Sequence, residues 1–226
     1  MHEQDKGTRR PGQSPSQGEV TTRHAPGNTG GRHARPDLAF AIHVTPSVPN
    51  GIIATRGGTI MASSDQFIID IVGRGGHASQ PHAALDPIPI ACELVLALQT
   101  LVTRKVNAFD PAVITVAHIT AGTTSNVIPE RAQIHGTIRT VSAMTRSFVH
   151  AEIEKLASGL AAAHGATAEI DLHLGYPVTV NDATVAAWSR EIAEGVLGDG
   201  SALEMPSPVM GAEDFSYILE KVPGSM

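Results

Sequence analysis

Polar and apolar residues alternate in four stretches of the chain, each rich in Ile, Val and Thr. Alternation with period two places every second side chain on one face, which predicts strands with one buried face. The predicted strands are Asp65–Arg74, Val113–Thr120, Ala132–Val141 and Ala166–Tyr176. A polar turn, GTTSNVIPE, joins the second strand to the third, so we expect these two to pair antiparallel.

Two helices are predicted between these strands. Asp86 is a good N-cap, and Pro87 fits the first helical position, where no amide hydrogen is needed. A second helix is expected over Met144–Ala163, with Gly165 placed to end it in the left-handed conformation. The first helix carries apolar residues at helical spacing, namely Ile90, Leu94, Val95, Leu98, Leu101 and Val102.

The resulting order from Asp65 to Tyr176 is β-α-β-β-α-β. In one compact domain this order predicts an α+β, ferredoxin-like sandwich of one antiparallel sheet backed by two helices. We place that domain at residues 58–176.

The flanking segments have a different character. Residues 1–35 are rich in Gly, Pro, Ser and Arg and poor in large apolar side chains, which predicts a disordered or non-native leader. Phe40–Val44 is expected to be a short buried strand with His43 near its end, and a helix is expected over Asp182–Val196. We interpret residues 36–57 and 177–226 as two remnants of one interrupted domain.

Charge and composition narrow the classes of partner. The 226-residue chain has a formal net charge of −6 and a pI near 6.0, which argues against nucleic acid or an anionic membrane as partner. No apolar run approaches the roughly 20 residues that span a bilayer, and no secretory signal is visible. The single cysteine, Cys92, excludes an intramolecular disulfide framework and fits a reducing compartment. We therefore expect a cytoplasmic protein that acts on small polar molecules.

The glycine-rich loop after the first long strand has one competing interpretation. Gly73-x-Gly75-x-x-Ala78 superficially matches a dinucleotide-binding fingerprint. In that fingerprint the glycines run directly into a helix, whereas Pro81 and the Asp86 cap delay the helix here. The loop spacing therefore argues against a nucleotide site.

Five polar residues stand out, and each has an ordinary structural explanation by itself. His77 and His82 lie five apart in a loop and would be surface residues, because that spacing gives no common helical face. Asn126 would stabilise a turn, Arg139 would pair with a carboxylate on the sheet, and His43 would be a core histidine.

Several motifs together resemble those of a known family. They are AIHVTPSVPNGIIATRGGTIMAS, GRGGHASQPHAALDP, AGTTSNVIPERA with GTIRT, GYPVTVND and GAEDFSY, in that order from Asp37 to the C-terminus. The set looks like the zinc-dependent aminoacylase, hippurate-hydrolase and indole-acetyl-amino-acid-hydrolase amidohydrolases. This resemblance implies a dinuclear metal enzyme, with zinc or another divalent metal (Mn, Co or Ni), that cleaves the amide of an N-acyl amino acid. It also implies that the β-α-β-β-α-β domain is a lid inserted in the catalytic domain, through which the protein forms a homodimer.

The resemblance also implies roles for individual residues. His43 would be a metal ligand, and His77 would stabilise the oxyanion of the tetrahedral intermediate, commonly in the partner's site. Asn126 would bind the substrate near its carbonyl, and Arg139 would pair with its carboxylate. His82 would only fix its loop, and Gly211 and Glu213 of GAEDF would line the pocket as substrate-binding residues.

The chain departs from the family pattern at the metal site. The Cys-Gly-His-Asp run and the paired-glutamate segment of the family are absent, as is a final ligand histidine beyond Met226. One ligand, His43, is too few for a dinuclear site. We therefore expect a chain that retains no metal and is inactive alone. The alternative is a non-catalytic dimerisation or binding module with a ferredoxin-like fold.

Overall fold

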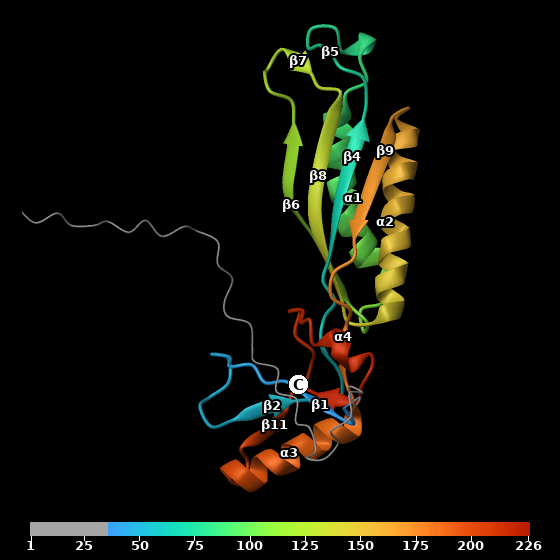
Figure 1. The fold of residues 1–226 in the computed structure, drawn as a ribbon. Helices are drawn as coiled ribbons and strands as arrows, with labels where there is room; N and C mark the ends of the chain where they lie inside the picture. The colour runs from blue at the N-terminus through green and yellow to red at the C-terminus, as the bar shows by residue number, and fades with distance from the viewer. Residues whose placement is uncertain (1–35) are drawn as a thin grey trace, which may run out of the picture.

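The computed structural model describes residues 36–226, so the prediction of a leader over residues 1–35 lies outside the described residues. Two parts follow one another along the long axis in Figure 1. The part formed by residues 65–173 is called the sandwich. The part formed by residues 36–64 and 174–226 is called the base.

The sandwich contains the predicted four-stranded antiparallel sheet. Its strands are β4 (Asp65–Val72), β6 (Ala112–Ala121), β8 (Arg131–Thr140) and β9 (Thr167–His173). They lie in the order β6-β8-β4-β9, with every neighbouring pair antiparallel. This is the strand order of a split βαβ fold, so the predicted α+β architecture is confirmed.

Two helices, α1 (Pro87–Lys105) and α2 (Ala143–Ala163), cover one face of this sheet (Figure 1). Both begin as their sequences predict, because the Asp86 carboxylate accepts a hydrogen bond from the Ile88 amide at 2.9 Å. Ser142 caps α2 in the same way, and Gly165 follows its end with φ of 79°. The helices leave the opposite face of the sheet open.

The sandwich core lies between the sheet and these helices. Its largest fully buried side chains include Phe67, Ile69 and Ile71 of β4 and Leu94 and Leu98 of α1. A Cβ on Gly136 would lie 2.2 Å from Phe67 Cζ, so only glycine leaves room for that ring. Burial alternates along β4 and β8, as the sequence pattern predicts.

A short two-stranded sheet forms the end of the sandwich farthest from the base (Figure 1). It consists of β5 (Gly76–His77) and β7 (Val127–Ile128), and the single turn η1 (Pro81–Ala83) follows β5. A Cβ on Gly73 would lie 2.1 Å from the Leu85 carbonyl oxygen. The glycine there permits close packing within the loop, which runs into β5 instead of a helix, so the loop lacks the geometry of a dinucleotide fingerprint.

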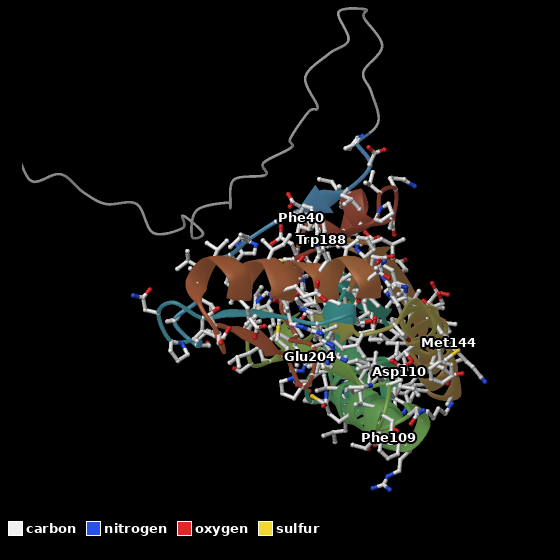
Figure 2. The ribbon with its side chains drawn as sticks, turned by 90° about the horizontal axis from the view of Figure 1, so that it is seen from below. Phe40, Phe109, Asp110, Met144, Trp188 and Glu204 are labelled. Atoms are coloured by element: carbon white, nitrogen blue, oxygen red, sulfur yellow. The ribbon has the colours of Figure 1, made fainter. Side chains whose placement is uncertain are left out.

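Short strand pairs and two helices make up the base. The pairs are β1 (Ala39–Phe40) with β12 (Gly224–Ser225), β2 (Ile53–Thr55) with β11 (Ala202–Glu204), and β3 (Gly58–Met61) with β10 (Thr179–Asn181). The first two pairs are parallel and the third is antiparallel. The helices are α3 (Ala183–Leu197) and α4 (Ser216–Leu219). Phe40 of β1 lies beside Trp188 of α3, with ring centroids 6.1 Å apart (Figure 2).

The predicted buried strand over Phe40–Val44 is wrong. Only Ala39 and Phe40 form a strand, and Ile42 and Val44 are 72% and 101% exposed. An apolar run becomes a strand only where a neighbour supplies a hydrogen-bonding ladder. Among the described residues, β12 alone offers that ladder, and it ends beside Phe40.

The expectation that no apolar run approaches membrane-spanning length needs a correction at helix α1. It is the one helix among the described residues that is long and apolar enough, by length and composition, to cross a membrane. Its apolar face, including Leu94, Leu98 and Leu101, is buried in the sandwich core. Packing within the fold therefore accounts for this composition.

Candidate functional site

His43 and Glu213, which the sequence separates by 170 residues, meet in the base. His43 Nε2 lies 2.5 Å from Glu213 Oε2, and their side chains are 39% and 18% exposed. His43 is therefore an exposed residue of an irregular segment, and the default interpretation of a core histidine is wrong. Two separately predicted site residues are in direct contact.

Hydrogen bonding controls the protonation of this carboxylate. Burial by itself would raise the pKa of Glu213, but hydrogen bonds with Asp214, His43 and the Phe215 amide outweigh burial and lower it. The neighbouring Asp214 has a raised pKa because its carboxyl group hydrogen-bonds to Glu213 and is partly desolvated. Glu213 is thus the ionised member of the pair and a suitable acceptor for the His43 ring.

The donor set at His43 does not fit a dinuclear metal centre. No group of three or more His, Cys, Asp or Glu side chains converges anywhere in residues 36–226. Metal centres of this kind need three or four protein ligands per ion, and the described residues here, His43, Glu213 and the Asp214 carboxyl group hydrogen-bonded to Glu213, do not form a group that could hold one. The sole cysteine, Cys92, is exposed on α1.

Gly211, the other predicted pocket residue of the GAEDF segment, lies in the loop that leads to Glu213. A Cβ on this residue would lie 2.8 Å from Met61 Cε, so the loop passes directly over the end of β3. Met61 also forms an isolated bridge with Val209. The loop is thereby tied to the base, and it carries Glu213 toward His43.

His77 lies at the opposite end of the molecule, on β5. Its Nδ1 accepts a hydrogen bond from the Ser79 amide at 3.1 Å and lies 2.7 Å from the Ser79 hydroxyl oxygen. A backbone amide only donates, so Nδ1 must be unprotonated and the neutral ring carries its proton on Nε2. The exposed ring therefore presents Nε2–H as a hydrogen-bond donor.

Asn126 is a direct neighbour of His77. Its carbonyl oxygen accepts a hydrogen bond from the Ala78 amide at 3.0 Å, and β5 pairs with β7 immediately after it. The Thr124 hydroxyl holds Asn126 Oδ1 at 3.0 Å, which turns the two side-chain N–H donors away from that contact. His77 and Asn126 together form an exposed cluster of donors, called the donor pair below.

His82 contributes no contact to this cluster. In the described part of the chain it forms no hydrogen bond or ion pair, and it is exposed on the turn η1. Backbone hydrogen bonds between Arg74 and Leu85 hold the loop instead. The predicted role of His82 in fixing the loop is therefore not supported by its contacts.

Arg139 lies near the base end of β8, opposite Val113 of β6. It is half-buried on the open face of the sheet, and within the described residues no carboxylate pairs with it. The expected structural ion pair is therefore absent there. Arg139 lies eight positions after Arg131 along β8, which corresponds to roughly 27 Å of strand between Arg139 and the end that carries the donor pair.

A second ionic cluster was missed from the sequence. Asp65, at the start of β4, is 1% exposed and contacts Arg146 and His150 of α2. The two α2 residues are four apart and so share a helix face, which is a signal that was available. The carboxylate partner, 81 residues before Arg146, could not be identified from spacing.

Comparisons with known proteins agree with this arrangement. Residues 62–165 match the family model described as "Peptidase dimerisation domain". An N-acetyldiaminopimelate deacetylase of Geobacillus sp. (strain WCH70) is 40% identical over 192 residues, covering 85% of this chain and 50% of that protein. The thermostable carboxypeptidase 2 of Saccharolobus solfataricus is 38% identical over 189 residues, covering 83% and 47%.

Solved structures give the same picture. A putative aminohydrolase from methicillin-resistant Staphylococcus aureus matches with a TM-score of 0.75 at 28% identity, covering 84% of this chain and 49% of that chain. A dinuclear metal binding peptidase from the M20 family, from Bacillus subtilis, matches with a TM-score of 0.69 at 32% identity, covering 84% and 46%.

The chain spans about half the length of the curated relatives it matches. The sandwich corresponds to their dimerisation domain, and the base corresponds to part of the catalytic domain of M20 structures. Residues 62–165 are thus an M20 peptidase dimerisation domain, and by sequence and by fold the rest of the described chain resembles part of the catalytic domain of M20 structures.

Proposed function

We propose that this chain is the lid-bearing half of a metal-dependent amidohydrolase that cleaves N-acyl amino acids, and that it acts as a homodimer. Its relatives include deacetylases and carboxypeptidases, whose names describe hydrolysis of an amide bond next to a carboxylate. The donor pair, Arg139 and the His43–Glu213 contact match the groups that such a reaction needs.

The observation that carries this proposal is the separation of these groups. The donor pair lies at the far end of the sandwich, whereas Arg139 lies at the near end of β8 and His43 and Glu213 lie in the base (Figure 1). Within one chain, roughly 27 Å of strand lies between the donor pair and Arg139. A second copy that lies antiparallel along the sandwich would bring the donor pair of one chain to the base of the other.

In this arrangement the described residues would act by binding and orienting the substrate. His77 Nε2–H and the Asn126 amide would donate hydrogen bonds to the carbonyl oxygen as it gains negative charge. Arg139 would hold the substrate carboxylate with its planar guanidinium. Glu213 would orient the His43 ring. Because the described donors do not complete a metal centre, the chain alone is expected to be inactive.

Transfer of the sandwich into a full-length relative tests the proposal. Residues 65–173 would replace the corresponding segment of the Geobacillus N-acetyldiaminopimelate deacetylase, and hydrolysis of N-acetyl amino acids would be measured. An active chimera that loses kcat on His77→Ala and on Asn126→Ala supports the proposal. Full turnover in both variants would refute the role of the donor pair.

The same chimera separates the role of Arg139, at the base end of the sandwich, from that of the donor pair at the far end. Arg139→Ala removes a charge-assisted contact worth about 1.5–3 kcal/mol, so KM should rise by roughly one to two orders of magnitude. Arg131→Ala is the matched control, because Arg131 lies on the same strand and pairs with Glu169. An unchanged KM in the Arg139 variant would contradict carboxylate binding there.

Dimerisation is tested on the chain itself. Light scattering should give about twice the chain mass of 23.6 kDa. Elemental analysis after dialysis should find far less than one zinc, manganese, cobalt or nickel ion per chain, with no hydrolysis of a hippurate-type substrate. Stoichiometric metal with turnover would show that residues outside the recognised set complete the site.

A second candidate function is a non-catalytic dimerisation module. Two observations favour it. No group of side chains that could hold a metal ion converges among residues 36–226. The ten-residue strand β6 is an edge strand whose outer side is unpaired in the described chain, so it could pair with another chain. An inactive chimera that still dimerises would favour this alternative.

A further inference from the structure

The sandwich and the base have separate cores. Every residue of the larger buried cluster and its partly buried neighbours lies between Phe67 and Leu172. The smaller cluster, Ala39, Phe215 and Val222, belongs to the base alone. Every pair of helices or strands in extensive contact also lies within one part. Shared apolar packing therefore does not set the angle between the two parts.

Two chain crossings connect the parts, and they lie side by side. The Ser64 amide, on the crossing that enters β4, donates a hydrogen bond to the Tyr176 carbonyl oxygen at 2.9 Å. A Cβ on Gly175, on the crossing that leaves β9, would lie 2.0 Å from the Ser64 carbonyl oxygen. The hinge is thus a close backbone contact that only glycine allows.

Asp65 ties these crossings to helix α2. Its carboxylate accepts hydrogen bonds from Arg146 Nε at 2.8 Å and Nη2 at 2.5 Å, lies 2.9 Å from His150 Nε2, and accepts from the Gly175 amide at 3.0 Å. Arg146 Nη2 also donates to the Gly175 carbonyl oxygen at 3.2 Å. The same oxygen accepts from the hydroxyl of Tyr217, a residue of α4 in the base.

The carboxylate is ionised in this environment. Burial opposes the charge, but hydrogen bonds from His150, Arg146 and the Gly175 amide outweigh it and hold the pKa of Asp65 well below its ordinary value. Leaving a buried carboxylate without partners is costly, so Asp65 stabilises the conformation in which Arg146, His150 and the Gly175 amide all contact it.

Neutral hydrogen bonds also join the two parts at this hinge, between Ser63 and Thr140 and from the Thr59 hydroxyl to the Val141 carbonyl oxygen. A cavity of about 220 Å³ lies beside Arg146, between the start of α2 and the base, lined also by Ala143, Val178, Leu219 and Glu220. Side chains that face each other across a cavity do not lock two bodies by close packing. Among the described contacts at this hinge, the cluster of Asp65 with Arg146 and Gly175 is the one that involves charged groups.

We infer that Asp65, Arg146 and His150 are positioning residues that clamp the two crossings to α2 and hold the sandwich at one angle to the base. This role lies outside the proposed hydrolysis and does not depend on it. It would determine where the far end of the sandwich, with the donor pair, stands relative to any partner chain.

Cys92 gives direct access to this angle. It is the only cysteine of the chain, it is exposed, and it lies on α1 of the sandwich. A second cysteine, Glu191→Cys, would lie on the exposed side of α3 in the base. Spin labels on both, in the full 226-residue chain diluted with unlabelled chain, would report the distance between the parts by double electron–electron resonance.

The labelled chain should give one narrow distance distribution. Asp65→Asn should broaden it at least about twofold or shift its maximum, because two orientations of the parts become accessible. Arg131→Ala, which removes the exposed pair with Glu169 far from the hinge, should leave it unchanged. An unchanged narrow distribution in Asp65→Asn, with native helix content by circular dichroism, would overturn the inference.

Arg146→Lys serves where Asp65→Asn loses helix content. Lysine keeps the charge but not the two-pronged contact, so the sandwich should stay folded while the distribution broadens. A distribution as narrow as that of the labelled parent chain would then decide against the clamp. Because neither readout measures hydrolysis, failure here is distinguishable from failure of the proposed function.

Discussion

The sandwich and the base contain similar elements but differ in what those elements bury. In the sandwich, two long helices and four strands enclose a continuous core that includes Phe67, Leu94 and Ile134 at 0% exposure. The base has a small core around Phe215 and leaves Trp188 46% exposed. Similar local structure therefore does not ensure a similar core, because burial depends on what lies on the other side.

The strand pairing of the base explains its open surface. Two of its three pairs are parallel, and parallel sheets are normally covered on both faces. Isolated two-stranded sheets are also of marginal stability. A groove of about 430 Å³ lies along α3, lined by Phe40, Ile42, Trp188, Ile192 and Val196 among others. The base therefore exposes apolar surface along α3.

The comparison predicts that core damage has its largest effect in the sandwich. Leu94→Ala removes a fully buried side chain of α1 and should lower the free energy of unfolding by about 2–5 kcal/mol. Leu96→Ala, on the same helix but 70% exposed, should change it by less than about 0.5 kcal/mol. Urea unfolding followed by circular dichroism measures both, and equal effects would contradict the assigned core.

The second largest effect is expected at the junction between the parts, where acid should reduce the stabilisation that Asp65 contributes. The pKa of Asp65 is lower in the folded chain than its ordinary value of 3.8, so its stabilisation is present above about pH 3.8 and declines as pH falls further. Asp65→Asn should therefore be less stable than the parent near pH 7, and the difference should shrink in acid. A constant difference from about pH 7 to pH 3, by urea unfolding, would argue against this carboxylate.

Loss of the contact in the base should matter less. Glu213→Gln removes the negative partner of His43, and because the pair is partly exposed the cost should be at most about 1 kcal/mol. The pKa of Glu213 is lowered in the fold, so that small contribution should be lost as pH falls below about 4.5. A cost comparable to that of Leu94→Ala would mean that the base has a tighter core than its burial indicates.

The smallest change in stability should come from the open groove. Val196→Glu replaces an apolar side chain that is 76% exposed, so the free energy of unfolding should change by less than about 0.5 kcal/mol. Binding of the dye ANS and aggregation should nevertheless fall, because an apolar patch is removed. Leu96→Glu on α1 is the control, and an equal fall in dye binding there would remove the distinction between the parts.

The sandwich could be predicted from the sequence almost entirely. Strands β4, β6, β8 and β9 and helices α1 and α2 lie within a few residues of their predicted ranges, because a long periodic pattern and a cap such as Asp86 act locally. The strand over Phe40–Val44 failed because its apolar run has a neighbour for two residues only. Short parallel pairs such as β2 with β11 carry no local signal that names their partner.

The candidate site divides in the same way. The resemblance singled out His43, His77, Asn126, Arg139, Gly211 and Glu213, and their catalytic and binding roles remain predictions. The structure shows that His77 and Asn126 share one end and that His43 and Glu213 are in contact at the other. No spacing in the sequence could show that these two groups stand apart within one chain.

By itself, the sequence determined the α+β order of elements, the helix caps and the glycines that loops require, since these depend on neighbours within a few residues. Only the tertiary structure decided that Asp65 is buried between Arg146 and Gly175, and that the base leaves α3 uncovered. Such contacts depend on which distant segments meet, and that is set by packing of the whole chain rather than by local pattern.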